Sequence, residues 1–342
     1  MAAVARMTIF ARATGRLAAL GRRVVVALLA LVLAAAALGP GEGRAAVAFD
    51  DWLAEFRAEA RAAGVSERTL ERALAGVAPI PRVIELDRRQ PEGTMTFVQY
   101  RERVINNARI QKGRRLLEEH RALLSRVEAE YGVPAEVIVA LWGIESNFGE
   151  NTGGFPVIAS LATLAHEGRR AAFFSGELMA ALRILDAGDI TPEAMNGSWA
   201  GAMGQSQFMP STFLAYAVDG SGDGKRDIWR NRADVFASMA NYLSRMGWDR
   251  RYIWGREVRV QNGVTTSGLD ERRPLSRWQA AGVRRADGGD LPAVAIDASL
   301  LKMDDGRGPS YLVYDNFRVL MRWNRSTYFA TSVGLLANAI RS

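Results

Sequence analysis

The sequence predicts a mainly α-helical protein of the α+β class, with a small β-rich element in its C-terminal part. Apolar residues recur at helical spacing over most of the chain, and Gly and Pro separate these stretches. Between residues 258 and 324, short β-prone runs and Gly- and Asp-rich turns replace that pattern. We therefore expect helical parts at 49–257 and 325–342, with a β-rich part at about 258–324.

Residues 1–48 have the pattern of a secretory signal peptide. Several arginines precede the apolar run Val24–Leu38, and the small residues Ala46-Val47-Ala48 follow it. The run has 15 residues, fewer than the roughly 20 that span a bilayer. We expect cleavage after Ala48, which would leave a periplasmic protein without a stable membrane span.

The composition excludes several classes of site and partner. The formal charge is +7, but six of the 44 basic residues and one of the 37 acidic residues lie in 1–48, so the remainder carries only +2. The basic charge thus belongs mostly to export and does not favour a nucleic-acid partner. The absence of cysteine excludes disulfides, thiolate metal sites and a lipidated cysteine, and the two histidines exclude a multi-histidine zinc site.

The helices are predicted from apolar spacing and from capping residues. Residues 49–77 should form two helices broken at Gly64, with Ser66 as the N-cap of the second, and residues 94–131 should form surface helices. Pro134–Asn147 is nearly free of polar side chains, which predicts a buried helix. Further helices are expected at Val157–Gly168, Phe173–Gly188, Ser211–Val218, Asp234–Trp248 and, behind the N-cap Ser326, at 326–340.

The β-rich part is predicted from three runs of β-prone residues. They are "REVRV" (Arg256–Val260), "PAVAI" (Pro292–Ile296) and "YLVYDNFRVLMRW" (Tyr311–Trp323). Because turn residues separate these runs, we expect a small sheet.

Glu145 is the one carboxylate near the end of the predicted buried helix. Helical spacing places it on the face of Ile138, Leu141 and Trp142. Burial and the negative end of the helix dipole both disfavour the charged form and should raise its pKa. Such a group suits general acid catalysis, as in glycoside hydrolysis. The alternative is a buried Glu that only binds backbone or pairs with an arginine.

The segment Gly197–Thr212, "GSWAGAMGQSQFMPST", combines glycines with neutral polar side chains. Glycines allow the backbone to approach a ligand closely, and neutral polar groups can bind sugar hydroxyl and acetamido groups. The residues in question are Gly197, Gly201, Gly204, Ser198, Gln205, Ser206 and Gln207. Neither GxxxxGK[ST] nor GxGxxG occurs, which disfavours a phosphate-binding loop.

The segment Asp219–Asp234, "DGSGDGKRDIWRNRAD", has the start of an EF-hand-like calcium loop. The twelfth position is Arg230 instead of Glu, so Asp234 would have to close the site, with Asp227 as a further candidate. The candidate ligands are Asp219, Ser221, Asp223, the carbonyl of Lys225, and Asp234. A plain surface turn is the alternative.

Together, "GIESNFG", "GAMGQSQFMPS" and the Asp-rich loop before "ANYL" resemble the lytic murein transglycosylase B family, and the likeness covers nearly all of residues 50–342. Further matching pieces are "LDRRQPE", "PVIASLATLA", "YFATSVGLLA" and "NFRVLMRWNRSTY". The resemblance implies a lysozyme-like helical catalytic domain. It also implies cleavage of the β-1,4 bond between N-acetylmuramic acid and N-acetylglucosamine in peptidoglycan glycan strands, without water, to give 1,6-anhydromuramoyl ends.

The same resemblance implies roles for individual residues. Glu145 matches the single catalytic acid and base, and no cofactor is expected for the chemistry, although calcium could be structural. The matching substrate-binding positions are Ser198, Gln207, Tyr242, Asn324, Tyr100 and Arg170, and the matching calcium positions are Asp219, Ser221, Asp223 and Asp234. Phe173 and Trp323 depart from the pattern, because tyrosines are expected there.

Two other functions stay open at this point. A hydrolytic muramidase or other glycosidase could use Glu145 together with a water-activating carboxylate such as Glu150 or Asp223. A non-catalytic, calcium-dependent glycan-binding protein could retain only the fold. For the peptidoglycan enzyme we expect a monomer that binds glycan strands, with cell-wall enzyme complexes as further partners.

Overall fold

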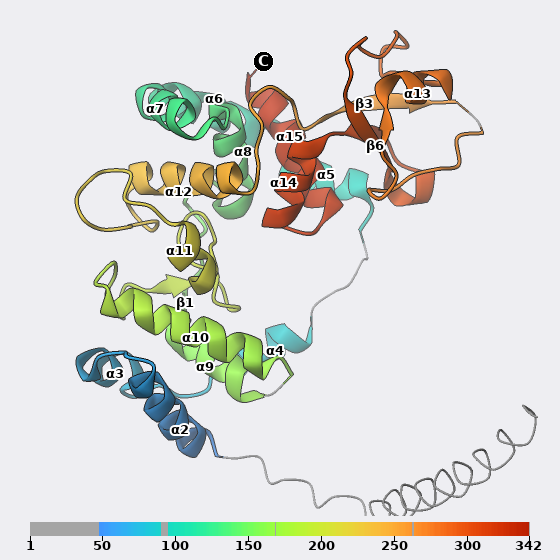
Figure 1. Ribbon diagram of the computed structural model, residues 1–342. Helices are drawn as coiled ribbons and strands as arrows, with labels where there is room; N and C mark the ends of the chain where they lie inside the picture. Colours follow the sequence, from blue (N-terminus) through green and yellow to red (C-terminus); the bar gives the residue numbers. More distant parts are fainter. Residues whose placement is uncertain (1–47, 90–94, 168, 262, 342) are drawn as a thin grey trace, which may run out of the picture. The chain divides into compact units, whose positions relative to one another are not determined.

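The computed structural model describes residues 48–89, 95–167, 169–261 and 263–341 (Figure 1). The chain divides into two compact units, Met1–Trp52 and Leu53–Ser342, and apart from residues 49–52 at the start of the first helix the features below belong to the second. The predicted signal peptide lies outside the described residues, except for Ala48. Within the described part, no helix is both long enough and apolar enough to cross a membrane.

The predicted helical class is confirmed, because helices account for most of the described chain. They are α2 (Phe49–Ala62), α3 (Glu67–Leu74), α4 (Pro81–Arg88), α5 (Phe97–Val104), α6 (Asn107–Glu119), α7 (Arg121–Tyr131), α8 (Ala135–Ser146), α9 (Val157–Glu167), α10 (Ala171–Asp186), α11 (Pro210–Tyr216), α12 (Arg232–Arg245), α13 (Leu275–Ala280), α14 (Asp315–Trp323), α15 (Thr327–Arg341) and the short 3-10 helix η1 (Met303–Gly306).

The strands form a small antiparallel sheet and a separate strand pair. The sheet has the order β4-β6-β7-β3-β5 and encloses a small apolar core that includes Trp278, Leu300 and Leu312. The strands are β1 (Phe155–Pro156), β2 (Asn196–Gly197), β3 (Gly255–Val260), β4 (Arg273–Pro274), β5 (Val283–Arg285), β6 (Asp297–Lys302) and β7 (Ser310–Val313). The predicted β-rich element is therefore present.

Two details of that β-rich prediction are wrong. Pro292–Ile296 is irregular, and the strand β6 begins directly after it. The run expected to continue as a strand to Trp323 instead forms helix α14 after β7. Asn316, Val319 and Leu320 are all buried, and a helix places residues at this spacing on one face, whereas a strand would place Val319 and Leu320 on opposite faces.

Helix α8 is the buried helix that the sequence predicts. It packs against α15, α6, α7 and α12. It ends where Asn147 and Phe148 both adopt left-handed backbone angles, with φ of 51° and 62°. The reversed chain lays the ring of Phe148 against Gly143, where a Cβ would meet ring atoms at 2.7 Å. The end of α8 is thus fixed by its own following residues.

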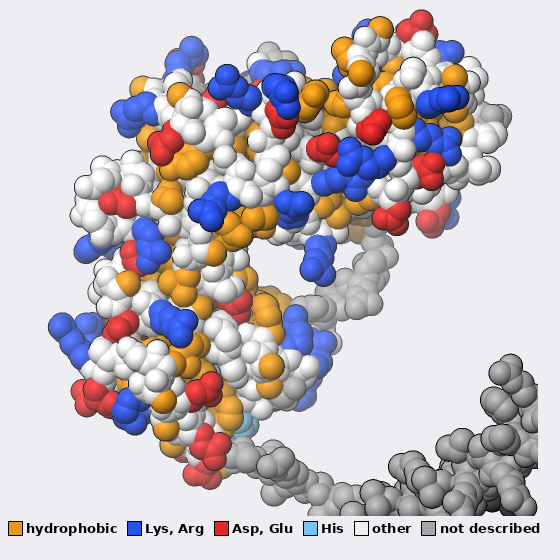
Figure 2. Space-filling view, in the orientation of Figure 1, with side chains coloured by type: hydrophobic (Ala, Val, Ile, Leu, Met, Phe, Trp, Pro, Cys, Tyr) orange, Lys and Arg blue, Asp and Glu red, His pale blue; other side chains and the backbone are white. Residues whose placement is uncertain are grey.

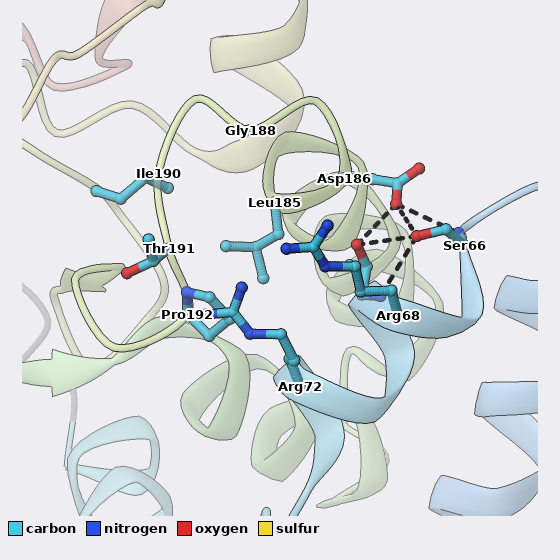
Figure 3. A pocket seen from close by; sticks show the side chains of 10 residues that line it. Ser66, Arg68, Arg72, Leu185, Asp186, Gly188, Ile190, Thr191 and Pro192 are labelled. Atoms are coloured by element: carbon cyan, nitrogen blue, oxygen red, sulfur yellow. Dashed lines mark hydrogen bonds between the residues drawn. The ribbon is translucent and has the colours of Figure 1, made fainter.

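Helix α3 begins at the predicted N-cap. The Ser66 Oγ accepts a hydrogen bond from Thr69 N at 3.3 Å. Asp186, at the end of α10, accepts hydrogen bonds from the hydroxyl groups of Ser66 and Thr69 (Figure 3). The hydrogen bond from Ser66 is the main reason why the pKa of Asp186 lies below its usual range. A surface pocket beside this network lies between α3 and the end of α10. It contains none of the predicted site residues.

Candidate active site

Glu145 lies in the last turn of α8 and is partly buried. Ile138, Leu141 and Trp142 on the same helical face are 0% exposed. Burial raises the pKa of Glu145 to about 7, and a hydrogen bond from Trp323 acts in the opposite direction. The carboxyl group therefore holds its proton close to neutral pH, as the helical spacing predicts.

Trp323, at the end of α14, is the direct partner of Glu145. Its indole Nε1 donates a hydrogen bond to Glu145 Oε1 at 2.6 Å. The indole ring contacts the rings of Tyr242 and Phe208, with centroids 4.8 and 5.2 Å away. Tyr242 is held in turn, because its hydroxyl donates to the carbonyl of Arg322 at 2.8 Å. Aromatic side chains from three segments therefore form one group, and Trp323 joins this group to the carboxyl of Glu145.

Two further predicted residues lie near this group. The negative charge of Glu145 contributes, after burial, to the raised pKa of Tyr100 on α5, which places the phenol close to the carboxyl. Asn324 directly follows Trp323 and is exposed, and its Oδ1 accepts a hydrogen bond from Ser326 N at 3.0 Å. Tyr100 therefore lies near Glu145, Tyr242 is connected to it through Trp323, and Asn324 is the chain neighbour of Trp323.

The predicted residues Ser198 and Gln207 belong to a compact loop. Bridges between Gly197 and Met203 and between Met203 and Phe208 fold the segment back on itself. Ser198 Oγ accepts from Ala202 N at 3.0 Å, and Gln207 Nε2 donates to the carbonyls of Thr152 and Gly204 at 3.1 and 2.8 Å. Both side chains are partly exposed. Gln207 adjoins Phe208, which connects this loop to the aromatic group around Glu145.

The other two polar residues of this loop lie inside the protein. Gln205 and Ser206 are buried, with 3% and 0% of their surface exposed. Gln205 Oε1 accepts from the Trp142 indole at 2.9 Å, and its Nε2 donates to the carbonyl of Trp229 at 2.7 Å. Because protein groups bind both the oxygen and the nitrogen of its amide, Gln205 joins the loop to α8.

The loop glycines lie where the protein itself leaves no room for a Cβ. A Cβ on Gly197 would lie 2.2 Å from the carbonyl oxygen of Ala202, and one on Gly201 would lie 2.4 Å from the Leu161 side chain. A Cβ on Gly204 would lie 2.7 Å from the carbonyl oxygen of Ile228. These glycines make room for the protein's own atoms.

Arg170 makes contacts with residues outside this group. It precedes α10, donates to Asp87 Oδ1 at 2.7 Å and lies over the ring of Phe174 at 4.8 Å. Arg169 binds the same buried carboxylate at 2.6 Å. The two guanidinium groups hold the pKa of Asp87 below its usual range, although burial opposes them. Asp87 was not identified from the sequence, although it lies in the quoted "LDRRQPE" motif.

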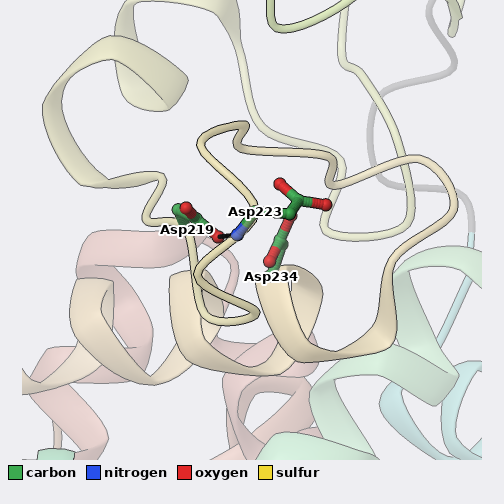
Figure 4. A group of neighbouring side chains, drawn as sticks. All are labelled: Asp219, Asp223 and Asp234. Carbon is green, nitrogen blue, oxygen red and sulfur yellow. Dashed lines mark hydrogen bonds between the residues drawn. The ribbon is translucent and has the colours of Figure 1, made fainter.

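The predicted calcium ligands come together at the start of α12 (Figure 4). Oxygen atoms of Asp219, Asp223 and Asp234 lie within 4.8 Å of one another. The Ser221 hydroxyl donates to Asp219 at 3.1 Å, and Lys225 N donates to Asp223 at 2.9 Å, which places both residues beside the cluster. Four of the predicted ligand residues thus lie in one loop, and Asp234 joins them from the first turn of α12.

The residues of this cluster fit a hard cation. All candidate donor atoms are oxygens, which calcium prefers. Asp234 is 0% exposed, and its pKa is raised first by burial and also by the charges of Asp219 and Asp223. A bound dication would offset that repulsion. Asp227 does not join the cluster, because its Oδ1 accepts hydrogen bonds from Trp229 N and Arg230 N, both at 2.9 Å.

Comparison with known proteins gives one consistent family. Residues 48–338 match the family model described as a transglycosylase SLT domain. The chain is 35% identical over 254 residues to membrane-bound lytic murein transglycosylase B of Escherichia coli K12, covering 71% of this chain and 67% of that protein.

Solved structures agree with the sequence match. SltB3 of Pseudomonas aeruginosa in complex with NAG-anhNAM-pentapeptide is 46% identical, with a TM-score of 0.83 over 86% of this chain and 80% of that chain. The Escherichia coli lytic transglycosylase Slt35 in complex with calcium is 32% identical, with a TM-score of 0.74 over 84% of this chain and 92% of that one. The chain therefore belongs to the transglycosylase SLT family and is a lytic transglycosylase of the murein B type, acting on peptidoglycan.

Proposed function

We propose that this enzyme cleaves the β-1,4 bond between N-acetylmuramic acid and N-acetylglucosamine without water, with Glu145 as its single acid and base. Glu145 gives its proton to the glycosidic oxygen while the bond from that oxygen to C1 of the muramoyl residue breaks. The C6 hydroxyl of the same residue then bonds to C1 and returns its proton to Glu145. The products are an N-acetylglucosamine hydroxyl end and a 1,6-anhydromuramoyl end.

The observation that carries this proposal is the partly buried Glu145, whose pKa is raised by burial to about 7. Among the described residues, burial and the Trp323 hydrogen bond are the influences on its pKa, and neither comes from a second carboxylate. A hydrolase of the usual kind needs such a second group to activate water or to form a covalent intermediate. A lone acid is consistent with an internal hydroxyl as the nucleophile.

The two carboxylates proposed for a hydrolytic mechanism have other partners. Glu150 pairs with Lys112 at 2.6 Å and accepts from the Asn147 amide at 2.6 Å. Asp223 accepts from Lys225 N and belongs to the acidic loop. These contacts favour the non-hydrolytic reading over the muramidase alternative.

Digestion of purified peptidoglycan tests the reaction. The expected muropeptides carry anhydromuramoyl ends, lower in mass by one water than hydrolysis products, and they incorporate no label when the digest contains heavy-oxygen water. A known muramidase serves as the control, because hydrolysis incorporates the heavy oxygen into the new reducing ends. Labelled reducing ends from this enzyme would make it a hydrolase.

We further propose that calcium binds through Asp219, Asp223 and Asp234, with Ser221 and the Lys225 carbonyl beside them, and that it stabilises the loop without taking part in the chemistry. If the Kd is about 10⁻⁴ M, calcium at about 10 mM should stabilise the fold by roughly 2.7 kcal/mol and raise Tm by several degrees. Thermal unfolding with calcium, magnesium or a chelator measures this shift.

The matched variants for the calcium site are Asp223→Asn and Asp305→Asn. Asp223→Asn removes the negative charge of one carboxylate of the cluster. Asp305→Asn removes the same charge on η1, outside the cluster, where 98% of the side chain is exposed. Calcium should still stabilise Asp305→Asn but no longer Asp223→Asn. An equal Tm shift in both variants would show that the ion binds elsewhere.

Export is also part of the proposal. The arginines, apolar run and small-residue triplet of residues 1–48 support cleavage after Ala48 and a periplasmic enzyme that meets glycan strands there. Amino-terminal sequencing of the protein from the periplasmic fraction should begin at Phe49. An intact amino terminus would contradict cleavage.

A further inference from the structure

We propose that Trp323 is a positioning residue that keeps the transferable proton of Glu145 on Oε2. This inference rests on the proposed acid and base role of Glu145. The sequence singles out Trp323 only as a departure from an expected tyrosine, and the hydrogen bond to Glu145 gives that departure a chemical meaning.

The first step is the geometry of the donor. An indole Nε1–H can donate a hydrogen bond but cannot accept one. In this protein it points at Glu145 Oε1, with 2.6 Å between the nitrogen and the oxygen. The indole plane is fixed by the rings of Tyr242 and Phe208, with centroids 4.8 and 5.2 Å away. Oε1 is therefore held as an acceptor.

The second step follows from the chemistry of a neutral carboxyl group. It carries one O–H and one carbonyl-like oxygen, and only the latter accepts well. A proton on Oε1 would compete with the indole hydrogen for the same oxygen, so the proton is held on Oε2. Oε2 is then the atom that donates to the glycosidic oxygen.

The third step concerns the return of the proton. Once Glu145 has lost its proton, the indole N–H stabilises the negative charge through a charge-assisted hydrogen bond to Oε1. Oε2 remains free to take the proton of the C6 hydroxyl. A tyrosine hydroxyl in place of the indole can both donate and accept, so it would allow the proton on either oxygen. Trp323 thus commits one oxygen to both proton transfers.

The other ionisable groups around Glu145 do not change charge in the same pH range. Tyr100 on α5 and Tyr242 on α12 have pKa values raised by burial above the ordinary value of 10. Arg109 on α6 is coupled to Tyr100 and, as a guanidinium, stays protonated even though burial lowers its pKa. The alkaline limb of the activity profile therefore reports Glu145.

The test compares Trp323→Phe with Trp248→Phe. The first variant removes the donor while keeping an aromatic ring against Tyr242 and Phe208. Trp248 is also largely buried, but its Nε1 has no hydrogen-bond partner among the described residues, so its loss controls for removing an indole elsewhere. The readouts are the pH profile of kcat/KM and the separate values of kcat and KM.

In Trp323→Phe, the alkaline limb should move up by about one pH unit, because the hydrogen bond that lowers the pKa of Glu145 is lost. We also expect kcat to fall roughly tenfold, with KM changed less than kcat. Trp248→Phe should retain the wild-type limb. Carbon NMR titration of the Glu145 carboxyl gives the same pKa shift even if Trp323→Phe is inactive.

An unmoved limb and an unmoved Glu145 titration in Trp323→Phe would overturn the inference, as would an equal shift in Trp248→Phe. Product analysis of the same digests separates this result from the proposed function. Anhydro ends with an unmoved limb reject the role of Trp323 alone, whereas labelled reducing ends from the wild-type enzyme reject the non-hydrolytic mechanism itself.

Discussion

The Glu145→Gln variant is expected to cleave glycan about 10³-fold more slowly than the wild-type enzyme. Glutamine keeps the size of the side chain and can still accept the hydrogen bond from the Trp323 indole, but it has no acid proton to give to the glycosidic oxygen. The rate of release of soluble muropeptides from purified peptidoglycan measures the loss. A variant that cleaves at the wild-type rate would remove Glu145 from the mechanism.

The stability of the Glu145→Gln variant should differ from that of the wild type in a pH-dependent way. The pKa of Glu145 is raised from 4.5 to about 7 by burial, so the unfolded chain loses this proton at lower pH than the folded protein does. The contribution of Glu145 to wild-type stability therefore falls as pH rises from about 4.5 to about 7, and the Gln variant lacks this loss. At pH 8 the variant should be more stable by on the order of 1–3 kcal/mol, measurable as a higher Tm.

Gly153→Ala should be the most damaging small substitution near the site. Gly153 has a φ of 90°, and a Cβ there would lie 2.0 Å from the carbonyl oxygen of Gly197 and 2.6 Å from Ser198 N. Both neighbours are backbone atoms of the strand pair β1–β2 and of the loop that carries Ser198, so they cannot move aside singly. We expect a loss of about 3–5 kcal/mol in the free energy of unfolding.

Gly154→Ala is the matched control for that substitution. Gly154 is the next residue along the chain, is also exposed, and has no atom within 4 Å of an added Cβ. The same added methyl group should change the free energy of unfolding by less than about 1 kcal/mol there. Denaturant unfolding of both variants measures the difference, and similar midpoints would mean that the β1–β2 contact adjusts to the methyl group.

The elements that the sequence predicted well are those specified by local spacing. Helix α8 and the position of Glu145 follow from a run of apolar residues, because a helix places residues three and four apart on one face. The N-caps Ser66 and Ser326 accept hydrogen bonds from backbone N–H groups three residues later, as their types indicate. Such features need only a few neighbouring residues.

The features that the sequence did not predict depend on contacts between distant segments. Trp323 and Glu145 are 178 positions apart, and nothing in the local pattern around either residue indicates their hydrogen bond. In the sequence, Gln205 resembles a ligand-binding amide in a polar loop. In the structure, its amide forms hydrogen bonds with Trp142 and with the carbonyl of Trp229 inside the protein. The helix α14 follows a strand within one β-prone run, because burial at Phe317 and Leu320 overrides local propensity.

The contact between Gly143 and Phe148 makes "GIESNFG" a single packing unit. The Phe148 ring occupies the space that a side chain at 143 would need, and it can do so because Asn147 and Phe148 turn the chain back at the end of α8. The size of the residue at 143 and that at 148 should therefore vary together among relatives, with a larger residue at 143 accompanied by a smaller one at 148. The direction of the Glu145 side chain would then depend on the residues at 143 and 148 together, and not on the glutamate alone.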